Sequence, residues 1–149
     1  MSNNTDPIVF YQIIRDSLHM DEGRTCEQIG HLIQQLFIKY FKIQVLHSSK
    51  ELRITVSEED WLHAKMLEDW MNNYGSKKIT VYASEEQWQQ IKQEHKQQFM
   101  VCNGLEKTTE TVMGFWPCYK SVFSKLIREL PTQPSDKAPE VAKVEVSQN

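Results

Sequence analysis

Hydrophobic residues recur at helical spacing in several stretches of the chain and alternate with polar residues in others. The strongest helical repeat runs from about 25 to 40, where Thr25 and Gln28 can form a capping box. Apolar and polar residues alternate at 43–45 and 52–56 around the turn 47–50, which predicts a β-hairpin. A first helix is predicted over about 8 to 20, because apolar residues behind Pro7 also follow a helical spacing: Val9, Phe10, Ile13, Ile14 and Leu18.

The centre of the chain contains a near-duplication, in which residues 54–61 return in similar form as residues 79–88. Each copy is a β-branched stretch that runs directly into a helix, with Ser57 or Ser84 at the N-cap position. The pattern predicts helices over about 58–73 and 85–99 and a strand over 78–82. Gly75 is expected to end the first of these helices in a left-handed conformation.

The last part of the chain predicts one more helix, beginning at Pro117 and ending before Pro131. Its core face comprises Tyr119, Val122, Phe123, Leu126, Ile127 and Leu130. From residue 132 onward the chain is rich in proline, charge and small residues, so residues 132–149 are predicted to form a disordered tail.

These elements together predict an α+β fold with the order ααββαβαα. Its small mixed sheet would have three strands, formed by a hairpin and a βαβ crossover that share a strand. About five helices would pack with this sheet. We expect a single domain over residues 1–131, because 149 residues of which 40% are hydrophobic suffice for one core.

Composition narrows the classes of protein. A net charge of -3 and a pI near 6.0 argue against a strongly basic nucleic-acid binder. The odd number of cysteines, without a close pair, is atypical of a secreted disulfide framework. The N-terminus lacks the pattern of a signal peptide, and no stretch has the roughly 20 apolar residues of a membrane span. We therefore expect a cytoplasmic protein that does not associate with membranes.

No motif indicates a metal, a cofactor or a phosphate loop. The spacings Cys26 to His31, His47 to His63 and Cys102 to Cys118 match no common set of metal ligands, and no glycine cluster precedes a helix. The acidic pairs Glu58-Glu59 and Glu85-Glu86 are explained by the helix dipole. We predict no cofactor, no metal site and no catalytic residue from these patterns.

Cys118 has the most reactive setting of the three thiols, because a helix starting at Pro117 would stabilise its thiolate. Nucleophilic catalysis also needs a base, and the sequence nominates no particular histidine for that role. The favoured interpretation is a small buried residue.

Nucleic-acid binding is the alternative function, carried by Lys39, Lys42, Lys77 and Lys78 beside aromatic residues that could stack on bases. The order of elements over residues 8 to 82, with Leu52 to Val56 followed by Trp61 and Trp70, resembles the N-terminal domain of the bacterial replication initiator, a KH-type fold. That resemblance implies recruitment of other proteins, with weak contacts to single strands in some cases.

The leading hypothesis is a non-enzymatic protein-protein interaction module, such as an adaptor or an accessory subunit of a larger complex. Its basis is apolar surface in excess of one core face on the helices over 58–73 and 85–99. A homodimer could use the same surface, and an enzyme whose site residues are dispersed in sequence stays open. The residues predicted to bind the partner are Leu62, Met66, Trp70, Trp88 and Ile91.

Overall fold

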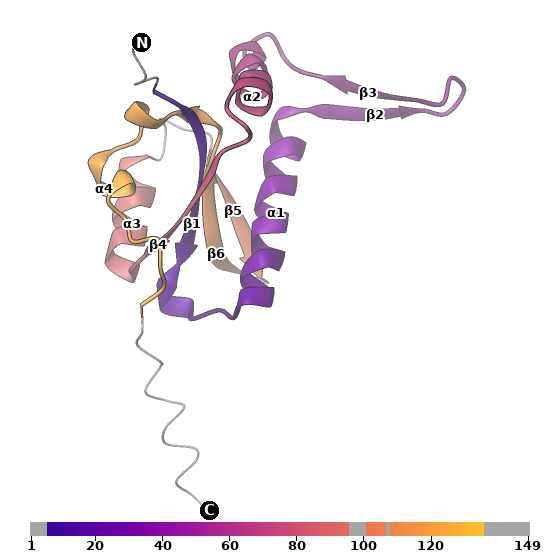
Figure 1. Cartoon of the computed structure of the whole chain (residues 1–149). Coiled ribbons are helices and arrows are strands. Elements are labelled where there is room, and N and C mark those ends of the chain that lie inside the picture. Colours follow the sequence, from indigo (N-terminus) through magenta and orange to yellow (C-terminus); the bar gives the residue numbers. More distant parts are fainter. Residues whose placement is uncertain (1–5, 96–100, 107, 136–149) are drawn as a thin grey trace, which may run out of the picture.

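A computed structural model describes residues 6–95, 101–106 and 108–135, and its arrangement is shown in Figure 1. Two 3-10 turns, Asp16–Leu18 and Lys120–Val122, supplement the regular elements. The strands and helices are β1 (Ile8–Arg15), α1 (Glu22–Tyr40), β2 (Lys42–Leu46), β3 (Glu51–Thr55), α2 (Trp61–Asn73), β4 (Lys78–Ala83), α3 (Glu85–Glu94), β5 (Val101–Glu106), β6 (Thr109–Phe115), β7 (Cys118–Tyr119) and α4 (Lys125–Arg128).

A mixed sheet organises the domain, with the strand order β4-β1-β6-β5. β1 runs parallel to β4 and antiparallel to β6, while the short β7 pairs with the start of β1. The α+β class is therefore confirmed, but the sheet is larger than the three-stranded sheet predicted from the sequence, and its parallel pair is β1 with β4.

β1 is buried on both of its faces, which makes the domain three-layered. Successive side chains of a strand point to opposite faces. Val9, Tyr11 and Ile13 pack with α3 and α4 on one side, whereas Phe10 and Ile14 pack with α1 and α2 on the other. Figure 1 shows α1 and α3 on opposite sides of the sheet.

The helix predicted over residues 8–20 is wrong, because this segment is the central strand β1 followed by a 3-10 turn. A strand with two buried faces has apolar residues in a continuous run rather than in alternation. Ile8 to Tyr11 and Ile13-Ile14 form such a run, and some of its members also fit a helical spacing. The predicted resemblance to a KH-type domain loses its first element for the same reason.

The predicted hairpin is confirmed as β2 and β3, but it does not join the main sheet. It projects from the end of α1 as a two-stranded arm, so the predicted βαβ crossover from the second hairpin strand to residues 78–82 is also wrong (Figure 1). The parallel crossover instead begins at β1 and passes through α1, the arm and α2 before it reaches β4.

Most other central elements follow the sequence pattern, but α2 begins at Trp61 with Asp60 as its N-cap and not at 58 behind Ser57. Residues 96–99, the end of the helix predicted over 85–99, lie outside the described residues. α3 begins at Ser84 with the predicted capping box, in which Ser84 and Gln87 bond reciprocally. Gly75 has a φ of 61°, as expected of a residue that ends a helix in the left-handed region. The cap of α1 is Asp21 rather than Thr25, because the Asp21 carboxylate accepts the backbone N–H of Arg24.

The long helix predicted from Pro117 to Leu130 is wrong. The chain instead forms β7, a 3-10 turn and the four-residue α4. Ser124 starts a new cap there, since its Oγ accepts the backbone N–H of Ile127 after an extended Phe123. Phe123, Ile127 and Leu130 are nevertheless buried as predicted, whereas Tyr119 and Val122 are exposed. The strands β5 and β6 had no counterpart in the sequence prediction.

The predicted tail lies mostly outside the described residues, which end at 135, and the domain boundary at 131 stays a prediction. Pro131 itself is bound to the sheet, because its carbonyl accepts the backbone N–H of Tyr82 at 2.9 Å.

Within the described part of the chain, no helix combines the length and apolar character needed to cross a membrane.

α1 packs closely on the sheet at Gly114 of β6, where a Cβ would lie 2.7 Å from Leu32 Cδ2 and 3.1 Å from its Cγ. Because Leu32 is fully buried, we expect Gly114→Ala to lower the free energy of unfolding by roughly 1–3 kcal/mol through overpacking. Urea denaturation measures this change.

Gly30→Ala is the matched control, since nothing lies within 4 Å of the added Cβ and alanine favours the helix by about 0.5–1 kcal/mol. Equal stability of Gly114→Ala and the wild type would mean that α1 does not depend on this close approach.

Candidate functional site

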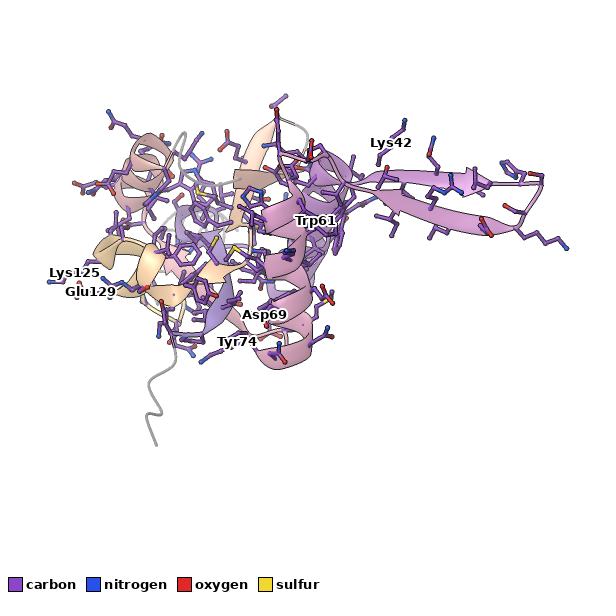
Figure 2. All side chains as sticks on the ribbon, turned by 90° about the horizontal axis from the view of Figure 1, so that it is seen from above. Lys42, Trp61, Asp69, Tyr74, Lys125 and Glu129 are labelled. Carbon is purple, nitrogen blue, oxygen red and sulfur yellow. The ribbon has the colours of Figure 1, made fainter. Side chains whose placement is uncertain are left out.

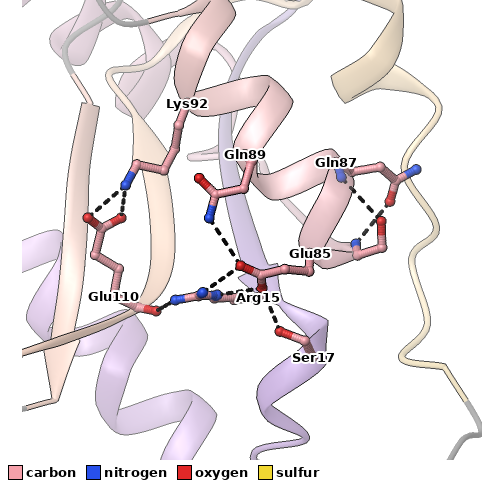
Figure 3. Close-up of polar contacts among 8 residues, drawn as sticks. Arg15, Ser17, Glu85, Gln87, Gln89, Lys92 and Glu110 are labelled. Carbon is pink, nitrogen blue, oxygen red and sulfur yellow. Dashed lines mark hydrogen bonds and ion pairs between the residues drawn. The ribbon is translucent and has the colours of Figure 1, made fainter.

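The carboxyl ends of the parallel strands β1 and β4 define one edge of the sheet, and polar side chains gather there. β1 ends at Arg15, and β4 leads through Ser84 into Glu85 at the start of α3. Glu110 lies beside them, one residue inside β6. Ligands of α/β sheets commonly bind outside the carboxyl ends of strands. We call the side chains of Arg15, Ser17, Glu85, Gln89, Lys92 and Glu110 the carboxyl-edge network (Figure 3).

Arg15 and Glu85 form the centre of this network. The guanidinium donates from Nη2 to Glu85 Oε1 at 2.6 Å and from Nε to Glu85 Oε2 at 2.9 Å, a bidentate arrangement. Ser17 and Gln89 donate to the same carboxylate at 2.8 and 3.0 Å. Glu85 thus holds the guanidinium in one orientation.

A second ion pair lies next to the first. Lys92 Nζ is 2.8 Å from Glu110 Oε1 and 2.7 Å from Oε2, joining α3 to the start of β6. The backbone carbonyl of Glu110 also accepts a hydrogen bond from Arg15 Nη1 at 3.1 Å, which links the two pairs (Figure 3). The network therefore spans β1, α3 and β6.

A buried polar contact attaches α1 to the same end of β6. Thr111 donates from Oγ1 to Gln28 Oε1 at 2.8 Å, and both side chains are buried. Because a buried polar group without a partner is costly, this bond fixes where the first turns of α1 lie against β6. The positive N-terminal end of α1 is consequently placed near the carboxyl edge.

The ion pair between Arg15 and Glu85 shifts the pKa of both groups. Hydrogen bonds from Arg15, then from Gln89 and Ser17, lower the pKa of Glu85 from 4.5 to about 2. The same bond to Glu85 raises the pKa of Arg15. Glu85 is therefore ionised at neutral pH and is a poor proton acceptor, so its role here is to position a permanent cation.

The family model named Peptidyl-tRNA hydrolase PTH2 matches residues 8–132, from the first residue of β1 to just beyond α4. This chain belongs to the PTH2 family. No curated protein gives a significant match.

Membership of the PTH2 family contradicts the prediction of a non-enzymatic interaction module, since the family is named for a hydrolase. The sequence interpretation missed Arg15, Glu85 and Lys92 because they are far apart in the chain. One signal was available: if residues 8–15 are assigned to a strand parallel to 78–83, Arg15 and Glu85 fall at the same edge.

The five residues predicted to bind a partner do not form one surface. Leu62 is 71% exposed on α2, Met66 and Trp70 are half-buried, and Trp88 and Ile91 are fully buried between α3 and the sheet. The narrow apolar stripe of α3 is thus a core contact and not an exposed docking edge.

The four lysines of the alternative prediction lie at the opposite end of the sheet from the carboxyl-edge network. Lys39 ends α1 and Lys42 begins β2, while Lys77 and Lys78 precede and open β4. Lys78 Nζ lies 5.3 Å from the ring centre of Trp70 and donates to the Ser76 carbonyl. These lysines do not converge with Arg15 or Lys92.

Cys118 lies in β7 and not at a helix N-terminus, and burial raises the pKa of its thiol to about 11. Cys118 is half-buried against the core, so the favoured interpretation of a small packed residue holds only in part, and its raised pKa argues against a reactive thiol. His95 Nε2 lies 3.3 Å from Ser124 Oγ, but His95 is buried between α3 and α4, and burial lowers its pKa. Within the described ranges, no three His, Cys, Asp or Glu side chains converge as metal ligands.

Glu85→Gln should lower the urea midpoint at pH 7, because it removes the charge that pairs with Arg15. The lowered pKa of Glu85 means that its stabilisation is complete above about pH 4.5 and disappears as the pH falls toward about 2. The difference between Glu85→Gln and the wild type should therefore shrink across that interval, as followed by urea denaturation.

Glu86→Gln, in the same exposed helical turn but outside the network, provides the control. A difference between Glu85→Gln and the wild type that stays constant from pH 7 to pH 2 would contradict this assignment.

Native Cys26 and Cys118 should differ strongly in their rates of alkylation at pH 8. Cys26 is exposed, whereas the raised pKa of Cys118 leaves it almost entirely protonated. In a Cys102→Ser background, iodoacetamide labelling followed by peptide mass spectrometry should show rapid modification of Cys26. Modification of Cys118 should be fast only in denaturant, and equal native rates would refute its burial.

Proposed function

We propose that this protein hydrolyses the ester bond between a peptide and the terminal ribose of tRNA, and that the carboxyl-edge network is its active site. The observation that carries this proposal is the match of the PTH2 family model to residues 8–132, which include every member of the network. The positively charged side chains of Arg15 and Lys92 at the carboxyl edge support it, because the substrate is anionic on its RNA side.

The reaction needs one water molecule. The water oxygen adds to the ester carbonyl carbon, negative charge develops on the carbonyl oxygen, and the bond to the ribose oxygen then breaks. One water proton ends on the ribose hydroxyl, and the other is released to solvent, so the peptide leaves as a carboxylate. The protein must therefore stabilise an oxyanion and guide a water molecule, tasks that fixed cations and carboxylates can perform.

Arg15 and Lys92 are proposed to stabilise negative charge, either on the developing oxyanion or on the adjacent phosphate. Their carboxylate partners hold both cations in place before the substrate binds, which lowers the cost of reorganisation. Because Arg15, Ser17 and Gln89 all donate to Glu85 and hold its pKa at about 2, Glu85 is a poor proton acceptor. We therefore assign proton transfer from water to Glu110, whose carboxylate is contacted by the single side chain of Lys92 among the described interactions.

The tRNA body extends beyond the ester, so nucleic acid is a proposed partner of other surfaces too. β1 is eight residues long, which separates its two ends by roughly 25 Å at about 3.3 Å per residue. Lys77 and Lys78, at the far end, are proposed to contact phosphates of the tRNA body rather than the ester. Peptidyl-tRNA forms where translation occurs, so the expected cytoplasmic location is part of this proposal.

Purified protein should release peptide from an N-acetyl-aminoacyl-tRNA, measured by acid precipitation of the labelled tRNA ester. Arg15→Ala and Lys92→Ala should each lower kcat/KM by roughly 10²-fold, as for loss of one group that stabilises an oxyanion. Glu110→Gln should lower kcat with little change in KM, since it removes a proton acceptor and keeps the side chain's shape.

Lys125→Ala is the matched control, because Lys125 also pairs with a glutamate, Glu129 at the end of α4, but is not part of the carboxyl-edge network. Figure 2 shows that pair on the side of the domain opposite the arm. Full activity of folded Arg15→Ala and Lys92→Ala would place the active site elsewhere, and an inactive wild type would refute hydrolysis.

A further inference from the structure

The arm formed by β2 and β3 is the part of the structure that the proposed hydrolysis does not use. It leaves the domain between α1 and α2, at the end of the sheet remote from the carboxyl-edge network (Figure 1). Figure 2, which shows the structure from above, shows that the arm extends away from the rest of the domain. Lys42 lies near the base of the arm, and Trp61 lies at the start of α2.

The two faces of the arm differ in character. The register pairs Ile43 with Ile54 and Val45 with Leu52, so these four side chains share one face. Gln44 and Arg53 form a pair on the other face, where Leu46 is the one apolar residue of the two strands. The four apolar side chains are between 49% and 64% exposed, which is unusual for paired aliphatic residues.

A two-stranded hairpin of this length is marginally stable by itself, and an exposed aliphatic face adds a cost in water. The side chains of β2 and β3 are mostly exposed, so the domain does little to cover the arm. More apolar surface lies at its base, where Ile38, Trp61 and Leu62 are also exposed. With the four side chains of the arm face, they make seven exposed large apolar side chains on the arm and its base, and exposed apolar surface of this extent marks interaction sites.

The ends of the arm carry complementary features. The tip is a four-residue turn, 47–50, that includes Lys50, while the segment entering α2 contains the exposed acidic residues Glu58 and Glu59. Beside that segment, a cleft of about 580 Å³ opens at the base of the arm, lined among others by Ile38, Val56 and Asp60. The cleft offers space that the tip would fill, and although Lys39 and Lys42 also line it, the adjoining Glu58 and Glu59 are acidic partners that Lys50 can reach.

We propose that two copies of this chain associate by exchanging their arms, face to face and antiparallel. A two-fold axis through the middle of the paired arms makes the contact self-complementary, with Val45 and Leu52 of both copies buried in the centre. It also places the tip of each arm at the base of the other, where Lys50 faces Glu58 and Glu59 of the partner copy. Both carboxyl-edge networks stay accessible in this dimer.

Sedimentation equilibrium of the full chain over a range of concentrations tests the association. The wild type should sediment as a dimer, and Val45→Asp with Leu52→Asp should weaken association about a hundredfold or more by burying unpaired carboxylates. Gln44→Asp with Arg53→Asp, on the opposite face, should stay dimeric. All variants should keep the wild-type circular dichroism spectrum, because the arm lies outside the domain core.

Charge reversal tests the antiparallel arrangement. Lys50→Glu alone and Glu59→Lys alone should each weaken the dimer by a few-fold to tenfold, and the double variant should recover it. If the arms were parallel, the two Lys50 side chains would face each other, and Lys50→Glu alone would not weaken association through Glu59. Failure of the double variant to recover would therefore overturn the antiparallel exchange.

Two results would refute the second copy as the occupant. One is a wild type that remains monomeric at high micromolar concentration, and the other is an arm-face variant, Val45→Asp with Leu52→Asp, that sediments as the wild type does. A monomer whose arm binds tRNA, with binding lost in the Arg53 variant, would assign the arm to RNA instead. Hydrolysis at the carboxyl edge is measured independently in the same variants, so failure of this proposal leaves the proposed activity untouched.

Discussion

The burial of β1 on both faces is the constraint on which the rest of the structure depends. Seven of its eight residues are buried, and it pairs with β4, β6 and β7. A strand in this position needs a helical layer on each side to remove its side chains from water. α1 and α2 provide one layer, and α3 and α4 provide the other.

The candidate site follows from where this burial ends. Arg15 is the only residue of β1 that reaches solvent, and its charge must be balanced at the rim of an apolar core. Glu85 can balance it because the parallel partner strand ends at the same edge and the capping box fixes the first turn of α3. Fold and proposed chemistry thus depend on one interaction, since the ion pair at the rim of the core also fixes the cation that we propose acts on the substrate.

Local signals predicted those elements whose pattern has a single explanation. The amphipathic α1, the hairpin, β4 and the Ser84 cap each follow from nearby residues. The strand at residues 8–15 was assigned to a helix because a doubly buried strand loses its alternation. The site could not be found without that strand, because Arg15 and Glu85 are 70 positions apart and meet only through the parallel pairing. Cys118, by contrast, is half-buried against the core, and its raised pKa argues against the reactive thiol that was the less favoured interpretation.

The position of the arm within the crossover from β1 to β4 has a consequence for how this protein can change. Both ends of the arm are anchored by helices that pack on the sheet, so its length does not affect the strand register. Residues 42–55 can accordingly be shortened, extended or recoded by mutation while the core and the carboxyl edge keep their geometry. Mutations in the arm can therefore accumulate without disturbing the main sheet, so the proposed association through the arm can change independently of the proposed active site.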